Sequence, residues 1–202
     1  MSLQPPLDEG AAGAWRDGWF SLARQVPSPN FGPRPDPRDI SLAVVHSISL
    51  PPGVYGGDEI ERLFTNTLDW SAHPYFEQIR GAEVSAHFVI RRTGELIQFV
   101  SVLDRAWHAG RSCWQGRDNC NDFSVGIELE GLEDTPFELS QYQSLKILLD
   151  ALLQRWPITQ IAGHEHIAPG RKRDPGKAFE WAHLQSLLGW KADRFPAETG
   201  LA

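Results

Sequence analysis

The feature of the sequence that most constrains the fold is a short apolar run that ends in a histidine. The run is Ser41-Leu42-Ala43-Val44-Val45-His46-Ser47. Because polar residues do not alternate with apolar ones, the run is typical of a strand covered on both faces, in the middle of a sheet. We therefore expect a central strand over 41–47, with the imidazole of His46 near its end.

Strand and helix patterns are interspersed along the rest of the chain. Residues 85–90 and 95–100 favour two strands joined by a short hairpin connection, residues 124–130 alternate cleanly, and residues 161–164 favour a last short strand. Helical spacing of apolar side chains predicts helices at 14–24, 60–64, 141–155 and 177–188, with a capping box between Ser140 and Gln143 at the third. Long loops are expected at 48–83 and 101–122. The fold class is therefore α/β (α+β), with one mixed central β-sheet flanked by helices.

The length of 202 residues suits one domain, which we place at 13–190 between tails at 1–12 and 191–202. The net charge of −7 argues against nucleic acid as a partner, since phosphate binding needs a basic face, and against a polybasic membrane anchor. No basic and apolar leader pattern is evident at the start, so we expect a cytoplasmic protein with Cys113 and Cys120 reduced. Nothing in the sequence indicates an obligate protein partner.

Two histidines and one aspartate stand where a metal could be held. Considered alone, His46 is either a satisfied core histidine or a group at the mouth of a site. His164 follows a short apolar strand, and Asp174 comes ten residues later. Two imidazoles and one carboxylate form a set that zinc accepts, with a fourth position left for water. The spacing by itself leaves open that Asp174-Pro175-Gly176 is only a turn.

Three further features leave alternatives open. Glu128 and Glu130 share one face of their strand, so both are exposed carboxylates, or one is a general base in a cleft. Lys172 projects to the same side as Asp174, either to stabilise an oxyanion or as a solvated lysine. The loop Trp107-His108-Ala109-Gly110 suits sugar or peptide binding, or simple packing.

Six segments together carry a resemblance to a known family. They are 44–53, 72–76, 84–88, 105–110, 120–131 and 163–176, and the likeness extends from residue 19 to about 186. In this order they resemble the superfamily of zinc N-acetylmuramoyl-L-alanine amidases and peptidoglycan-recognition proteins. Within it, the chain is most similar to the 1,6-anhydro-N-acetylmuramoyl-L-alanine amidases of bacterial cell-wall recycling.

The resemblance implies the zinc amidase fold, one Zn²⁺ per chain, and hydrolysis of the amide between N-acetylmuramic acid and L-alanine in small soluble muramyl peptides. It implies His46, His164 and Asp174 as metal ligands, Glu128 as general base and Lys172 as oxyanion stabiliser. Contacts to the substrate are expected from Ser47, His87, Trp107, His108 and Arg171, with Arg111 and Arg117 as further cations for peptide carboxylates.

The chain departs from the family pattern at a few positions. Wider relatives often have cysteine at the Asp174 position and tyrosine at the Ala86 position, which is consistent with a larger catalytic share for Glu128. Ser47 and Gly170 replace the asparagine and glutamate usual in the nearest pattern. Two rival functions are a peptidoglycan-binding module without activity and an exported amidase that cuts intact peptidoglycan.

Overall fold

A mixed sheet of six strands, in the order β12-β5-β11-β6-β7-β3, lies at the centre of the computed structural model, which describes residues 14–196. Its strands are β3 (Arg24–Gln25), β5 (Leu42–Ile48), β6 (Phe88–Ile90), β7 (Leu96–Gln98), β11 (Ser124–Glu130) and β12 (Gln160–Gly163). β5 runs parallel to both of its neighbours, β11 and β12, whereas β6 and β7 are antiparallel. The mixed central sheet predicted from the sequence is confirmed.

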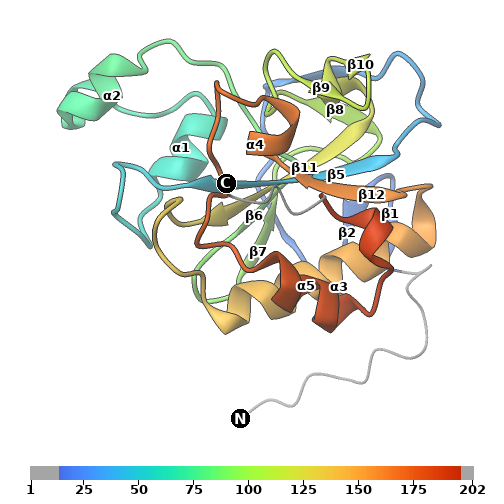
Figure 1. Ribbon diagram of the computed structural model, residues 1–202. Helices are drawn as coiled ribbons and strands as arrows, with labels where there is room; N and C mark the ends of the chain where they lie inside the picture. The colour runs from blue at the N-terminus through green and yellow to red at the C-terminus, as the bar shows by residue number, and fades with distance from the viewer. Residues whose placement is uncertain (1–13, 197–202) are drawn as a thin grey trace.

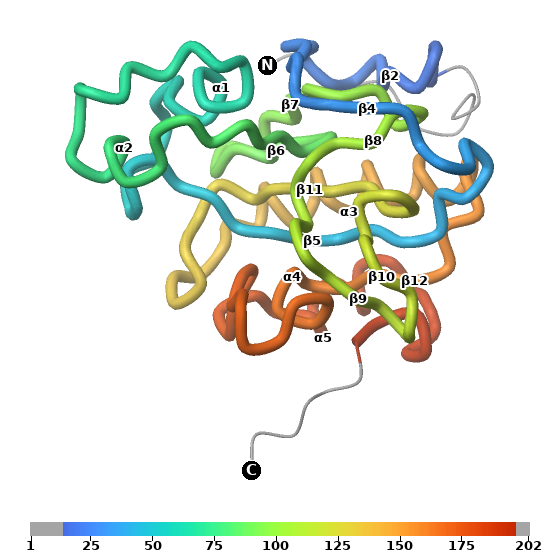
Figure 2. The backbone as a smooth tube through the Cα atoms, turned by 90° about the horizontal axis from the view of Figure 1, so that it is seen from above, coloured from blue at the N-terminus to red at the C-terminus, as the bar shows by residue number. Residues whose placement is uncertain are grey.

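Helices cover both faces of this sheet (Figure 1; Figure 2). On one face lie α3 (Leu139–Arg155) and α5 (Trp181–Leu188), and on the other α1 (Glu59–Phe64), α2 (Pro74–Gln78) and α4 (His164–Ile167). Val45 of β5 packs with Leu145 and Leu148 of α3, while Leu42 and Val44 pack on the opposite side. β5 is therefore covered on both faces, as its apolar run predicts.

The helix predicted at 14–24 is wrong. These residues form a hairpin of β1 (Trp15–Arg16) and β2 (Trp19–Phe20), followed by β3. Asp17 and Gly18 have φ angles of +50° and +77°, the two-residue turn that Asp-Gly favours between strands. The turn places the Trp15 ring on that of Phe20, with ring centroids 4.6 Å apart, and Phe20 is buried in the core. The Asp-Gly pair was the sequence signal for this hairpin.

The two predicted loops contain short elements. Segment 48–83 holds α1, the single turn η1 (Trp70–Ala72) and α2. Segment 101–122 holds β8 (Asp104–Ala106), which pairs with β4 (Phe31–Pro33), then the hairpin of β9 (Cys113–Trp114) and β10 (Arg117–Asp118), and the turn η2 (Cys120–Asp122). Both cysteines are free thiols. β8 was not predicted because pairing with a distant segment leaves no local pattern, and β9 and β10 were not predicted because strands of two residues are too short to show a period.

The helix boundaries also differ from the predictions. α3 begins at Leu139, where Gln141 Oε1 accepts from the Glu138 N–H at 3.0 Å, so the capping box lies two residues earlier than predicted. Ser140 instead donates to the Arg92 carbonyl oxygen. α5 begins at Trp181 rather than 177.

Beyond α5, the chain continues to pack against the domain. Residues of η3 (Ala192–Arg194) form a turn, and Phe195 is buried in the core, which differs from the tail predicted from 191. Residues 1–12 and 197–202 of the predicted tails lie outside the described residues. Within 14–196, no helix has the length and apolar character that crossing a membrane requires.

Candidate active site

The candidate metal ligands meet at the carboxyl ends of three parallel strands. His46 is the fifth residue of β5, and Gly163, the last residue of β12, pairs with Val45. His164, the residue after Gly163, therefore lies beside His46. It is the first residue of α4 and not part of the predicted strand. Asp174 comes from the segment after α4, whose backbone is tied back where Asp174 O accepts from the Glu165 N–H at 2.8 Å. The carboxyl edge of parallel strands is where such sheets commonly bind ligands.

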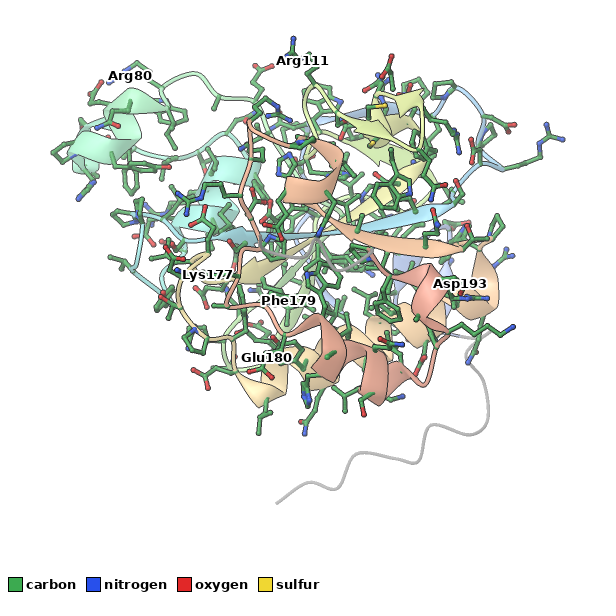
Figure 3. The ribbon with its side chains drawn as sticks, viewed as in Figure 1. Arg80, Arg111, Lys177, Phe179, Glu180 and Asp193 are labelled. Atoms are coloured by element: carbon green, nitrogen blue, oxygen red, sulfur yellow. The ribbon has the colours of Figure 1, made fainter. Side chains whose placement is uncertain are left out.

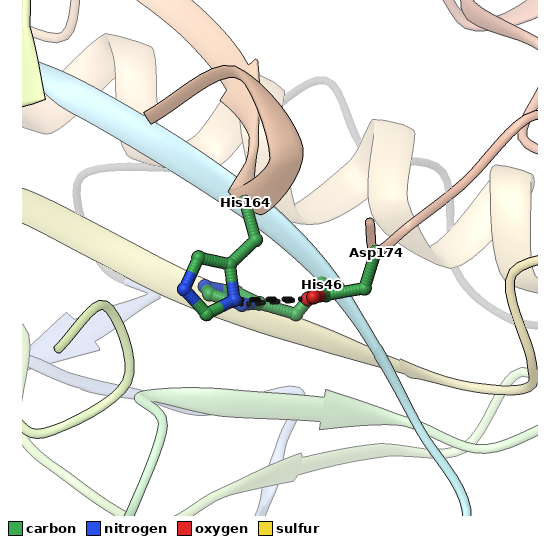
Figure 4. Close-up of side chains that lie close together, drawn as sticks. All are labelled: His46, His164 and Asp174. Carbon is green, nitrogen blue, oxygen red and sulfur yellow. Dashed lines mark hydrogen bonds and ion pairs between the residues drawn. The ribbon is translucent and has the colours of Figure 1, made fainter. Parts of the chain in front are cut away.

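One atom from each of these residues points to a common centre (Figure 4). His46 Nδ1 lies 2.9 Å from His164 Nδ1 and 3.2 Å from Asp174 Oδ2, and His164 Nδ1 lies 3.0 Å from Asp174 Oδ2. All three side chains are buried. This arrangement excludes the interpretation of His46 as an isolated core histidine and of Asp174 as a simple turn residue.

The charge states of this cluster follow from its burial. Burial lowers the pKa of His46 to about 4, against the opposing hydrogen bond to Asp174. Burial of Asp174 disfavours its charge, but the contacts with the His164 and His46 imidazoles outweigh this effect and hold the pKa of Asp174 below its usual range. The cluster thus presents a neutral His46 imidazole and an ionised Asp174 carboxylate, the forms in which these groups bind metal.

The donor set fits Zn²⁺. Tetrahedral zinc with bonds of about 2.0–2.1 Å sets neighbouring ligand atoms about 3.3 Å apart, close to the separations found here. Two imidazoles and one carboxylate leave a fourth position for water or substrate, as in catalytic rather than structural zinc sites.

Glu128 lies beside this centre because of the strand register. In the parallel pair of β5 and β11, Glu128 is the direct partner of His46, and its Oε1 lies 4.0 Å from His46 Nδ1. Its Oε2 is buried without a hydrogen-bond partner among the described residues. Burial, with the nearby charge of Asp174, raises the pKa of Glu128, whereas the charge of Lys172 opposes that rise. A bound cation would also oppose it.

Glu130, on the same face of β11, has a different role. Its carboxylate accepts from Arg91 Nη1 at 3.0 Å and from the backbone N–H groups of Gly56 and Arg92 at 2.7 and 3.1 Å. Arg91 also donates to Glu61 at 3.0 Å. Both oxygens of Glu130 thus accept hydrogen bonds, and the bond from Gly56 holds the 49–57 segment against the sheet. Of the two carboxylates left open by the sequence, only Glu128 is free to act on a ligand.

Replacing Glu130 by glutamine is expected to destabilise the fold by about 3 kcal/mol, because one partner of a buried ion pair is removed. Removing one partner of a buried ion pair typically costs about 3–5 kcal/mol. Because Arg91 keeps its ion pair with Glu61, we expect a loss at the low end of this range. Urea unfolding measures it, with Glu95→Gln as control, since Glu95 forms a pair with Arg24 in which both side chains are 45% exposed. Wild-type stability of Glu130→Gln, together with a large loss of rate, would show that Glu130 and not Glu128 acts on the substrate.

A groove with a volume of about 440 Å³ opens onto the cluster, a size typical of small-ligand sites. Its lining includes Glu128, Lys172, Trp107 and His108, together with an apolar wall to which Phe64, Tyr75, Ile79 and Val84 contribute. Lys172 forms no ion pair within residues 14–196, so its ammonium group is available to a ligand.

The predicted substrate contacts divide into two groups. Ser47, Trp107 and His108 line the groove. His87 does not, because it is fully buried beneath the site, where its Nδ1 accepts from the Gly126 N–H at 2.9 Å and its Nε2 lies 3.1 Å from Asp104 O. The expectation that His87 contacts substrate is therefore wrong: it supports β11 from below.

The three candidate cations are also placed differently from one another. Arg171 donates to the carbonyl oxygens of Ala109 and Arg111, both at 2.7 Å, and braces the 109–111 loop from outside the groove. Arg117 forms an ion pair with Asp39 and lies over the Phe123 ring. Arg111 is exposed and lies at the top of the view in Figure 3, and Arg80 is exposed at its upper left; neither lines the groove.

Residues that sequence reasoning missed complete the surroundings of the site. Tyr75 of α2 and Ile79, the residue that follows α2, line the apolar wall in a segment predicted as loop. Ile79 follows Tyr75 by four residues and Phe76 by three, and this spacing is the signal that could have indicated a helix. Asn121 accepts from two backbone N–H groups next to the site, and nothing in its local sequence indicates that.

The comparisons with known proteins agree on one family. The family model described as N-acetylmuramoyl-L-alanine amidase matches residues 36–177. The 1,6-anhydro-N-acetylmuramyl-L-alanine amidase AmpD of Citrobacter freundii is 52% identical over 174 residues, 85% of this chain and 93% of that protein.

Two solved structures extend this likeness. A crystal structure of a selenomethionine derivative of AmpD, 52% identical, superposes with a TM-score of 0.84 over 86% of this chain and 98% of that one. The Escherichia coli amidase AmiD, 28% identical, superposes with a TM-score of 0.54 over 74% of this chain and 57% of that one. The AmiD structure is a complex with the substrate anhydro-N-acetylmuramic acid-L-Ala-D-γ-Glu-L-Lys.

Proposed function

The chain belongs to the N-acetylmuramoyl-L-alanine amidase family, and from this premise we propose that it hydrolyses the amide between 1,6-anhydro-N-acetylmuramic acid and L-alanine in muramyl peptides. The relative at 52% identity, matched over 93% of its length, carries that activity in its name. The reaction removes the stem peptide from the sugar, a step of cell-wall recycling.

The observation that carries the proposal is the convergence of three ligand atoms beside an unpartnered carboxylate. His46 Nδ1, His164 Nδ1 and Asp174 Oδ2 lie within 3.2 Å of one another, and the buried Glu128 Oε2 has no partner among residues 14–196. We propose His46, His164 and Asp174 as the ligands of one Zn²⁺. A module that only binds peptidoglycan would not need Glu128 and Lys172 as well.

Zinc in such a site lowers the pKa of water and polarises the substrate carbonyl. Glu128 accepts the proton of the attacking water and then delivers it to the nitrogen of the departing L-alanine. The Lys172 ammonium group, which lines the same groove, stabilises the negative charge that develops on the carbonyl oxygen. Trp107 and the apolar wall from Phe64 to Val84 hold the sugar and exclude water from around the reacting bond.

The substrate is expected to be a small anhydro-muramyl peptide rather than the wall polymer. The groove volume of about 440 Å³ suits a ligand of one sugar and a short peptide. The net charge of −7 provides no general attraction to an anionic polymer. A cytoplasmic location, where recycled fragments would be met, stays a prediction.

A direct competition tests this preference. The zinc-loaded protein is given anhydro-muramyl-tripeptide together with insoluble peptidoglycan sacculi, and released peptides are separated by chromatography. We expect the soluble substrate to be consumed first. Equal or faster release from sacculi would instead identify an amidase of intact peptidoglycan, while leaving the zinc chemistry in place.

A further inference from the structure

The far nitrogen of each histidine ligand contacts the same two-residue loop segment, His108-Ala109. His164 Nε2 lies 3.1 Å from the carbonyl oxygen of Ala109. A carbonyl oxygen can only accept, so His164 carries its hydrogen on Nε2, which leaves the lone pair of Nδ1 facing His46 and Asp174. Arg171 Nη2 is 3.4 Å from the same nitrogen, but its hydrogens go to nearer carbonyl oxygens at 2.7 Å.

His46, the second histidine ligand, also has a hydrogen-bond partner at its far nitrogen. His46 Nε2 lies 2.9 Å from His108 Nδ1. When His46 Nδ1 is committed to a cation, the neutral ring must carry its hydrogen on Nε2, and His108 Nδ1 accepts it. His108 then has its own hydrogen on Nε2, 3.2 Å from Ser124 Oγ. The His108 side chain thus accepts the N–H of His46, and the Ala109 carbonyl oxygen accepts the N–H of His164.

Asn121 fixes the position of this segment. Its side-chain oxygen Oδ1 accepts from the backbone N–H of His108 at 3.1 Å and from that of Ala109 at 2.8 Å. One carboxamide oxygen therefore positions both acceptors. Asn121 is not among the residues that line the groove, and its side-chain oxygen faces the backbone of the loop instead.

Gly126 of β11 makes room for the His108 ring. A Cβ atom at this position would lie 2.4 Å from His108 Cγ and 2.6 Å from His108 Nδ1. The φ angle of Gly126 is not in the left-handed region, so an alanine there would be strained by contact with the ring rather than by its backbone conformation. The His108 ring can therefore take its position only because residue 126 has no side chain.

We propose that Asn121 and His108 are positioning residues that set the tautomer of both histidine ligands, so that each coordinates zinc through Nδ1. This inference rests on the proposed zinc site and deepens it. Partners that orient metal ligands in this way contribute roughly 10- to 100-fold to metal affinity or activity. His108 lines the groove, yet its Nδ1 is taken by His46, so its main contribution is to the ligand rather than to the substrate.

The zinc dissociation constant, measured by competition with a chromophoric chelator, tests the proposal without relying on activity. His108→Phe removes the acceptor and should weaken zinc binding about 10- to 100-fold, whereas His108→Asn places an oxygen near the Nδ1 position and should restore most of the affinity. Asn121→Leu should weaken binding similarly, and Asn121→Asp, which keeps an acceptor oxygen, should bind more tightly than Asn121→Leu. Gly126→Ala should resemble His108→Phe. Wild-type affinity in His108→Phe, or equal affinity of its Asn and Phe variants, would overturn the proposal.

A measurement on the unaltered protein is independent of whether the variants fold. In the zinc-loaded wild type, ¹⁵N-edited NMR of the imidazoles should show Nε2–H groups on His46 and His164 that exchange slowly with water. Hydrogens on Nδ1 with zinc on Nε2 would overturn the inference. Failure of the wild type to bind zinc at all would instead overturn the proposed function, so the two failures are distinguishable.

Discussion

Replacing Glu128 by glutamine is expected to lower kcat by about 10²- to 10⁴-fold while the zinc content stays at one per chain. The substitution keeps the shape of the side chain but removes the group that accepts the proton of water. Glu128 Oε1 lies 4.0 Å from His46 Nδ1 and is not among the three converging ligand atoms, so metal binding should persist. Rates of peptide release and elemental analysis of the same preparation measure both effects.

Glu133→Gln is the matched control for this experiment. Glu133 lines the same groove, but it lies after the end of β11 and is not a register partner of His46. We expect less than a tenfold change in rate. If Glu133→Gln lost as much activity as Glu128→Gln, general negative charge in the groove, rather than a positioned base, would explain the effect.

Replacing any one of His46, His164 and Asp174 by alanine is expected to abolish zinc retention and activity together. Each removes one of three protein ligands, so the loss of affinity should exceed the roughly 100-fold that follows from removing an outer partner. Dialysis against metal-free buffer followed by elemental analysis should show about one zinc per chain in the wild type and little in the variants. The wild type treated with a strong chelator should behave like them.

A histidine remote from the cluster provides the control. His73 caps α2, and its Nδ1 accepts from the Tyr75 N–H at 3.1 Å. Because His73→Asn keeps an acceptor for this N–H, the variant should retain its full zinc content. Full activity of chelator-treated wild type, or undiminished zinc in the Asp174 variant, would contradict the assignment of this centre.

Local patterns in the sequence were sufficient for elements whose structure follows from local periodicity. The strand predicted at 124–130 is β11 with the same bounds, and the run 41–47 became β5 shifted by one residue. In both strands, the spacing of apolar side chains indicates whether one or two faces are buried. The hairpin at 15–20 was missed because its two strands are too short to show a period, and only the Asp17-Gly18 turn marks it.

The sequence alone supplied the chemistry that is available: two imidazoles, one carboxylate, a second carboxylate and a lysine, in an order that resembles zinc amidases. The residue pattern by itself left open which carboxylate of β11 acts, since Glu128 and Glu130 differ in no local property, and only the resemblance implied Glu128. The tertiary structure distinguishes the two carboxylates, because the register of β11 with β5 sets Glu128 beside His46, whereas Arg91 and two backbone N–H groups engage Glu130. Likewise, only the packing of the 104–110 and 120–124 segments buries His87 and brings Asn121 beneath the ligands. Residue types fix which reactions are possible, but partners far apart in the chain determine which groups remain free to react.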